Sequence, residues 1–153
     1  MNTDAAVDSV GGRVGSGIII RDSEGNVLAS SSQKIMSGYT PQIAEAVAYL
    51  RGLVLAREAG LRPWEVELDA QTVVKLVSSL TVPCSEVGLV IKDIKLHLLN
   101  FPDSKISFVP MEANKAAHHL AKLGLLVEDV NVWLEECPPS VAPFVLGDRP
   151  NLM

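Results

Sequence analysis

Residues 14–35 read VGSGIIIRDSEGNVLASSSQKI, and they carry the clearest signal for a β-sheet in the sequence. Its first part, VGSGIIIR, is rich in β-branched side chains, which favour strands. The cluster DSEGN at residues 22–26 is typical of a turn, and residues 27–35 then alternate loosely between apolar and polar. The stretch therefore predicts a β-hairpin with a short connection that contains glycine.

Both flanks of the hairpin extend this pattern. Upstream, residues 1–7, MNTDAAV, predict a further strand. Downstream, Thr40 and Pro41 are typical of a helix N-cap and first helical residue, and Gly60 ends that helix. The remaining predicted elements are a strand at 64–69, a helix at 70–80, a helix at 86–99 capped by Ser85, a strand at 105–110 and a helix at 114–123 stopped by Gly124. This order indicates an α/β fold whose mixed sheet is flanked by helices.

The length of the chain, 153 residues, suits one domain and is too short for two comfortable ones. We expect that domain to span residues 1–126. Residues 127–153 contain Pro138, Pro139, Pro143 and Pro150. We interpret them as a C-terminal tail, partly irregular, with one short helical piece at 130–134.

Composition is typical of a soluble protein from a reducing compartment. Apolar residues make up 48% of the chain, which argues against disorder. Cys84 and Cys137 lie far apart without CxxC spacing and offer no zinc site, although a disulfide between them remains an alternative. The sequence contains no apolar run of about 18 residues, and Asp4 stands where a signal peptide would be basic or apolar. We expect an intracellular monomer without membrane contact, in the nucleus or the cytoplasm.

The charge balance argues against a nucleic-acid binder. The net charge is −5, whereas such proteins usually show a basic footprint. The lysines and arginines are scattered and form no dense patch in the sequence. We interpret Trp64 and Trp133 as core or tail anchors rather than as platforms for base stacking.

Glu45 is the single carboxylate in an apolar run, YTPQIAEAVAYL at residues 39–50. Its face of the predicted helix carries Ala48, Gly52 and Ala56, small residues that allow close packing, so we expect burial on both faces. A buried carboxylate on its own becomes neutral, whereas a bound metal ion keeps it ionised. The structural alternative is a glutamate that the positive end of the helix dipole favours.

Asp69 and Asp4 are two further candidates. Asp69 ends the predicted strand VELD, and ligands of open α/β sheets collect at the carboxyl ends of strands. Its alternative role is to cap the helix that follows. Asp4 lies on the first predicted strand, where Ala5 and Ala6 leave room around it, and its alternative is a solvated residue near the terminus.

Taken in order, the segments NTDAAV, GSGIIIRDSEGNVL, AEAVAYLRGLVLA, ELDAQTVV and NKAAHHLAK resemble the ribonuclease H family. More narrowly, the chain is similar over roughly residues 2–125 to plant ribonuclease H-like domains related to retroelement reverse transcriptases, and WLEECP at 133–138 is similar too. The resemblance implies a five-stranded mixed sheet with helices on both faces, in the order βββαβααβα. It also implies an acidic site for two divalent ions, Mg²⁺ or Mn²⁺, held by Asp4, Glu45 and Asp69.

The late helix departs from the family pattern. His118 stands where active members carry a fourth carboxylate, and Phe108 lies near the place of their mobile histidine. We keep His118 as a fourth catalytic candidate, since imidazole ligates Mn²⁺ better than Mg²⁺. The alternative is a surface histidine opposite Ala116 and Leu120. If His118 replaces a metal ligand, we expect activity that is slow, dependent on Mn²⁺ or lost.

The leading hypothesis is a metal-dependent endonuclease that cuts the RNA strand of RNA–DNA hybrids. Two divalent ions can clamp an in-line displacement at phosphorus, one activating water and the other stabilising the departing 3′ oxygen. By the resemblance, Asp4 would bridge both ions. The second hypothesis is a catalytically weak or inactive domain of the same fold that binds nucleic acid or a protein partner. A truncated fragment that holds Asp4 poorly is a third reading.

Overall fold

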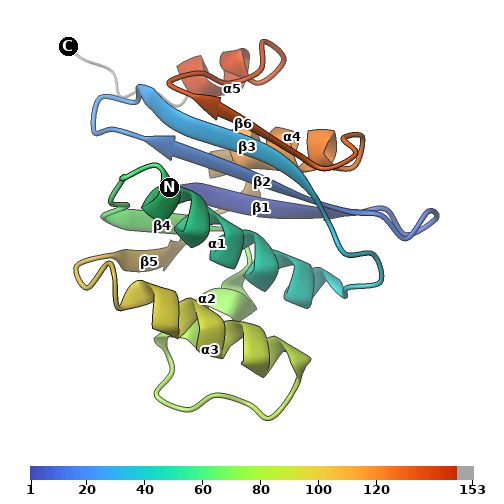
Figure 1. Ribbon diagram of the computed structural model, residues 1–153, viewed down its shortest axis with the longest axis vertical. Coiled ribbons are helices and arrows are strands. Elements are labelled where there is room, and N and C mark those ends of the chain that lie inside the picture. The colour runs from blue at the N-terminus through green and yellow to red at the C-terminus, as the bar shows by residue number, and fades with distance from the viewer. Residues whose placement is uncertain (148–153) are drawn as a thin grey trace.

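The computed structural model describes residues 1–147, so the end of the predicted tail, residues 148–153, lies outside the described part of the chain. The strands are β1 (Asn2–Val7), β2 (Val14–Arg21), β3 (Val27–Ile35), β4 (Glu65–Leu68), β5 (Lys105–Phe108) and β6 (Val130–Leu134). Within residues 1–147 these six strands form one sheet in the order β5-β4-β1-β2-β3-β6 (Figure 1).

The sheet is mixed. Strand β2 pairs antiparallel with β1 on one side and with β3 on the other, which forms the hairpin predicted at residues 14–35. Strands β4 and β5 add in parallel beyond β1, and β6 adds antiparallel beyond β3. The expected α/β fold class, a mixed sheet flanked by helices, is therefore confirmed.

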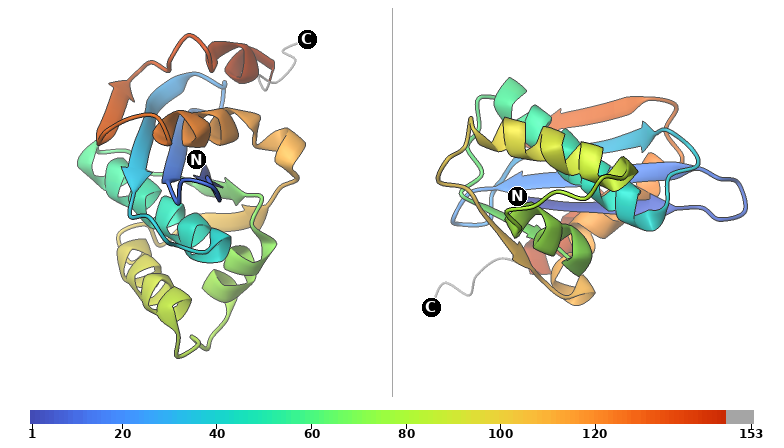
Figure 2. Two further views of the ribbon diagram at one scale, coloured as in Figure 1. Left: turned by 90° about the vertical axis from the view of Figure 1, so that its right-hand side faces the viewer. Right: turned by 90° about the horizontal axis from the view of Figure 1, so that it is seen from below.

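Helices cover both faces of the sheet. They are α1 (Pro41–Glu58), α2 (Gln71–Ser78), α3 (Glu86–Leu98), α4 (Lys115–Gly124) and α5 (Ala142–Gly147), with a 3₁₀ turn at Met111–Ala113. The first three share one apolar core with the sheet, whereas α4 and α5 enclose a second core on the opposite face (Figures 1 and 2). No helix within residues 1–147 is long and apolar enough to cross a membrane.

Local signals explain where α1 begins and ends. The Thr40 hydroxyl accepts the Ile43 N–H at 3.3 Å, and Pro41 occupies the first helical position. Gly60 follows the helix with a φ of 70°, a left-handed conformation that side chains disfavour. Ala48 and Ala56 are fully buried, so the small-residue face packs closely, as the sequence predicts.

Two glycines let α4 lie directly on β2. A Cβ atom on Gly17 would meet the Ala117 carbonyl and the Ala121 amide of α4, and one on Gly15 would lie 2.7 Å from the Leu125 amide. These obstacles are backbone atoms, which cannot swing aside as a side chain can. The two positions therefore set how close α4 comes to the sheet.

We expect Gly17→Ala to destabilise the protein by about 1–3 kcal/mol, because α4 must move away from β2 to accept the methyl group. Urea unfolding followed by circular dichroism measures the change. Gly147→Ala is the matched control, since a Cβ atom there meets only open space. A Gly17→Ala variant as stable as the Gly147→Ala variant would contradict this account of the packing.

The sequence interpretation is wrong at residues 130–134, which form strand β6 rather than a short helix. Five strands were expected, and the sheet within residues 1–147 has six. The physical reason is alternation: Trp133 packs into the core beneath α4, whereas Val132 and Leu134 are exposed. The predicted tail also contains α5, and the expected domain boundary at residue 126 stays a prediction.

Trp64 was expected to be a core or tail anchor, and the structure contradicts this. Its side chain is 64% exposed, because it lies in the connection between α1 and β4 rather than inside either element. Trp133, in contrast, is partly buried against the core between α4 and α5. The anchor interpretation therefore holds for Trp133 alone of the two tryptophans.

Candidate functional site

The site begins where β1 and β4 lie side by side in the middle of the sheet. Asp4 projects from the centre of β1 and is only 3% exposed. The two strands pair at Asn2 and Glu67. Further along β1, the Ala5 N–H is bonded at 3.2 Å to the Glu45 carboxylate of α1 instead of a β4 carbonyl. At this point a carboxylate from a helix, and not the neighbouring strand, accepts the hydrogen bond from the β1 backbone.

Asp69 follows β4 directly, at the carboxyl end of this parallel strand. The N-cap position of α2 belongs to Ala70, whose methyl group cannot accept a hydrogen bond, and no side chain caps the helix. Capping, the alternative role for Asp69, is therefore not what the structure shows. Instead, the end of β4 directs Asp69 toward the other two carboxylates.

Three carboxylates that are far apart in the sequence converge here. One oxygen atom from each of Asp4, Glu45 and Asp69 lies within 4.8 Å of the others. Burial raises the pKa of Glu45 to about 10, with a further contribution from the adjacent Asp4. Burial, and again Asp4, raises the pKa of Asp69 to about 6. In both groups burial is the largest cause, because it disfavours the charged form, and the neighbouring negative charge adds to it.

The donor set fits a hard divalent cation. All three groups offer oxygen atoms, which Mg²⁺ and Mn²⁺ prefer. In addition, the Oε2 atom of Glu45 is buried and has no hydrogen-bond partner among the described residues. A buried carboxylate oxygen without a donor is costly, and a cation at the cluster would satisfy it.

His118 is the fourth residue that the structure brings to this site. It projects from α4, and its Nδ1 atom lies 2.8 Å from Oδ2 of Asp4. Its side chain is 29% exposed, so it forms one wall of the cluster with access to solvent. The alternative of a surface histidine that points away from the acidic residues is not what the structure shows.

A buried amide network holds α4 in place beside Asp4. The Asn114 side chain donates to the Thr3 carbonyl and accepts from the Asn2 amide, each at 3.0 Å. The His118 N–H in turn bonds to the Asn114 carbonyl at 3.0 Å. Asn114 therefore ties the start of α4 to β1 and so fixes the direction from which His118 reaches the carboxylate.

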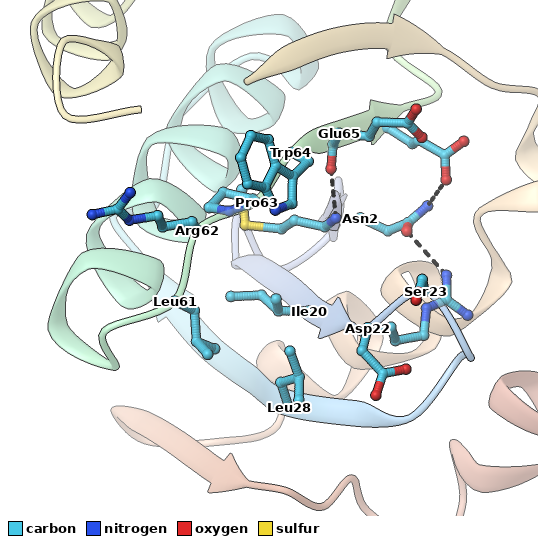
Figure 3. A pocket seen from close by; sticks show the side chains of 13 residues that line it. Asn2, Ile20, Asp22, Ser23, Leu28, Leu61, Arg62, Pro63, Trp64 and Glu65 are labelled. Atoms are coloured by element: carbon cyan, nitrogen blue, oxygen red, sulfur yellow. Dashed lines mark hydrogen bonds between the residues drawn. The ribbon is translucent and has the colours of Figure 1, made fainter. Parts of the chain in front are cut away.

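The sequence analysis missed the role of Asn2 and Asn114. Figure 3 shows Asn2 bonded on two sides, to Glu67 at 3.3 Å and to Arg21 at 3.0 Å. The available signal was an asparagine at the start of each element that carries a candidate, two residues before Asp4 and four before His118. This signal is weak by itself, because asparagine is common at helix starts for local reasons.

Two hollows differ in what lines them. An open depression of about 290 Å³ is lined by Glu45 and Asp69 together with Gln42 and Gln71. A larger hollow of about 620 Å³ lies at the starts of β1 and β4, below Trp64, and contains none of the four candidates (Figure 3). Since the titratable cluster is at the smaller depression, the chemistry points there rather than to the larger space.

Comparison with protein families gives a match. The family model described as reverse transcriptase-like matches residues 2–124. This is the part of the chain that carries Asp4, Glu45, Asp69 and His118. No curated protein sequence matches the chain.

Solved structures show the same fold. RNase H1 from the halophilic archaeon Halobacterium salinarum is 24% identical with a TM-score of 0.71, covering 81% of this chain and 94% of that one. LC11-RNase H1, solved in complex with an RNA/DNA hybrid, is 24% identical with a TM-score of 0.73, and the match covers 81% of this chain and 94% of that one. The N-terminal RNase H domain of a Mycobacterium tuberculosis protein is 24% identical with a TM-score of 0.71, and the match covers 80% of this chain and 89% of that one. At this identity the likeness establishes the fold alone.

Proposed function

The chain belongs to the reverse transcriptase-like family and has a ribonuclease H-like fold, and we propose that it is a nuclease. Specifically, it is a divalent-metal-dependent endonuclease that acts on the RNA strand of RNA–DNA hybrids. The observation that carries the proposal is the convergence of Asp4, Glu45 and Asp69, with ligand atoms within 4.8 Å of one another. The complex of LC11-RNase H1 with a hybrid supports the substrate class.

Asp4, Glu45 and Asp69 would hold the cations through their carboxylate oxygens. Bound divalent ions supply positive charge that polarises the scissile phosphate and makes water more acidic. The chain itself supplies position: β1, β4 and α1 are rigid elements with well-packed cores, so the three ligands need little rearrangement. The Ala5 N–H bond fixes Glu45, and the fixed Glu45 keeps its second oxygen directed to the cluster.

His118 acts as a positioning residue in this proposal. With the proton on Nδ1, the imidazole donates to Oδ2 of Asp4 and restricts the rotation of that carboxylate. The other Asp4 oxygen then remains free to face Glu45 and Asp69. Because α4 is tied to β1 through Asn114, the orientation of the imidazole depends on the fold and not on bound substrate.

Gln42 and Gln71 give a physical basis for choosing RNA. Both line the depression beside Glu45 and Asp69, and both carry neutral amides that can donate and accept hydrogen bonds. The 2′-hydroxyl is the group by which a protein distinguishes RNA from DNA. Amides bind a hydroxyl without adding charge to an acidic site, and this supports the proposal that these two residues contact the sugar next to the cleaved phosphate.

We expect Gln71→Ala to reduce the preference for RNA over DNA by about tenfold, because the RNA strand loses a hydrogen bond that a DNA strand cannot make. The measurement is kcat/KM on a hybrid and on the same hybrid with a single 2′-deoxy substitution at the cleaved sugar. An equal loss on both substrates would instead assign Gln71 a structural role.

The proposal is tested by incubating the protein with four labelled substrates: a hybrid, single-stranded RNA, duplex RNA and duplex DNA, each with Mg²⁺ or Mn²⁺. We expect cleavage of the RNA in the hybrid alone, with 5′-phosphate and 3′-hydroxyl ends, since water is the nucleophile. Ends with a 2′,3′-cyclic phosphate would indicate attack by the sugar hydroxyl. Absence of hybrid cleavage in both metals at high protein concentration would reject the proposal.

One observation favours a second candidate function, a domain that binds nucleic acid or a protein but cuts slowly or not at all. His118 bonds to Asp4, and by the family resemblance it stands where active members carry a fourth carboxylate, so one fewer negative ligand would be available to the cations. A binding domain would show an affinity for hybrid that falls with salt, without turnover. Cleavage that Asp69→Asn abolishes would remove this candidate.

A further inference from the structure

Strand β6 forms one edge of the sheet and is the outermost strand in the left view of Figure 2. Its sequence, VNVWL, contains neither a charged residue nor proline. Proteins commonly protect exposed edges with lysine, proline or a bulge, because an edge offers backbone groups to any passing strand. This edge carries none of those protections within the strand.

The pairing with β3 determines which backbone groups β6 leaves free. The Lys34 N–H bonds to the Asp129 carbonyl, and the Glu135 N–H bonds to the Leu28 carbonyl. In an antiparallel ladder bonded pairs alternate, so Asn131 and Trp133 also face β3 with their backbone groups. It follows that the N–H and C=O groups of Val130, Val132 and Leu134 point away from the sheet.

The same three residues expose apolar side chains. Val130 is 43% exposed, Val132 47% and Leu134 63%. These side chains lie on one face of the strand, opposite to Trp133, which enters the core beneath α4. The edge thus combines backbone groups that have no strand partner within residues 1–147 with a row of apolar side chains beside them, which is the combination that strand addition uses.

Acidic residues stand at both ends of the strand. Glu128 and Asp129 precede it, and Glu135 and Glu136 follow it. We propose that the outer edge of β6 binds an extended segment of a partner protein as an additional strand, with apolar residues at alternate positions and lysine or arginine at both ends. Backbone hydrogen bonds give such a complex its affinity, and the flanking charges select the partner.

The charges argue against two other occupants. A second copy of this chain, paired in either direction, would place its own acidic ends against those of the first copy, and like charges in register are destabilising. A nucleic-acid strand would bring phosphates to the same four carboxylates. A segment with basic ends has neither difficulty, and this preference is independent of the nuclease activity proposed for the acidic cluster at β1 and β4.

The test uses a fluorescent peptide, KKVTVTVKK, and its counterpart EEVTVTVEE, with binding to the whole chain measured by anisotropy. We expect the lysine peptide to bind at least about tenfold more tightly, with a difference that shrinks as salt is added. Two further lysine peptides carry N-methyl groups, one on its valines and one on its threonines. Only one set of amides can face β6, so one of these peptides should bind and the other should not.

Variants of the chain complete the test. Val132→Pro removes an N–H that faces solvent, which an edge strand tolerates, and should abolish peptide binding. Val132→Lys keeps the N–H but repels the lysine peptide, and should weaken its binding about tenfold relative to Leu80→Lys, a change at a fully exposed site elsewhere. Equal affinity for both N-methylated peptides, no binding of the lysine peptide, or dimerisation of the chain through β6 in sedimentation velocity would overturn the proposal.

Discussion

Asp4→Asn is expected to lower the rate of hybrid cleavage by about a thousandfold while leaving the protein folded. Asp4 is the most buried member of the cluster and the one that contacts His118, and both other carboxylates lie within reach of it. Asparagine has the same shape but no charge, so the cations lose the ligand that the rest of the site is built around. Single-turnover cleavage of a labelled hybrid measures the change.

Asp8→Asn is the matched control for this substitution. Asp8 lies just beyond the same strand, but its side chain is outside the cluster, is 23% exposed and pairs with Arg13 at 2.8 Å in the loop that follows. We expect Asp8→Asn to change the cleavage rate less than about twofold, because exposed ion pairs contribute little. An Asp4→Asn variant that keeps a tenth of the wild-type rate would show that the acidic cluster is not the catalytic centre.

Local signals in the sequence were sufficient for much of the fold. Thr40-Pro41 begins α1 because a hydroxyl and a ring constrain the backbone wherever they occur in a chain, and DSEGN turns the hairpin for similarly local reasons. Strand β6 was missed because its identity depends on β3, almost a hundred residues upstream, which provides its only partner strand within residues 1–147. A short apolar segment among acidic residues and prolines carries no local signal for that pairing.

The candidate site shows the same division. Glu45 stood out by itself, since one carboxylate in an apolar helix face requires an explanation. Its meeting with Asp4 and Asp69 came from the family resemblance, because spacing along the chain does not reveal which strands become neighbours. The contact between Asn2 and Asn114 joins residues 112 positions apart, and no pattern in either neighbourhood indicates it. The catalytic and metal-binding roles of these residues stay a proposal that the Asp4→Asn and Glu45→Gln variants test.

Removing metal ions should make stability depend strongly on pH, and Glu45 is the main cause. Its pKa is raised from an ordinary value of 4.5 to about 10, so the folded chain holds this proton more tightly than the unfolded chain. The resulting stability is complete below about pH 4.5 and is lost as pH rises toward 10. We therefore expect metal-free protein to melt at a lower temperature at pH 8 than at pH 5, by roughly 4–8 °C for a change of about 2 kcal/mol.

Divalent ions should oppose the loss of stability at pH 8, and their effect shows whether the acidic cluster causes that loss. Cations compete with protons for the same oxygens, so adding Mn²⁺ or Mg²⁺ should raise the melting temperature more at pH 8 than at pH 5. Glu45→Gln should behave differently: without metal it should be about 1–2 kcal/mol more stable than the wild type at pH 8, and added ions should stabilise it little. Differential scanning calorimetry at the two pH values measures both changes.

Glu58→Gln separates this explanation from a general effect of charge. Glu58 closes the same helix but is exposed, so its replacement removes an equal charge without touching the cluster. If Glu58→Gln matched the stabilisation of Glu45→Gln, net charge and not the buried cluster would be responsible. Glutamine keeps an oxygen that can accept from the Ala5 N–H, so if Glu45→Gln instead destabilised the metal-free protein at pH 8, the carboxyl group itself would stabilise the fold, and its burial would need no cation. Residues that are kept for binding commonly lower the stability of the unbound protein, whereas residues that are kept for structure raise it. The stability of the metal-free protein can therefore decide between a metal site and a structural one.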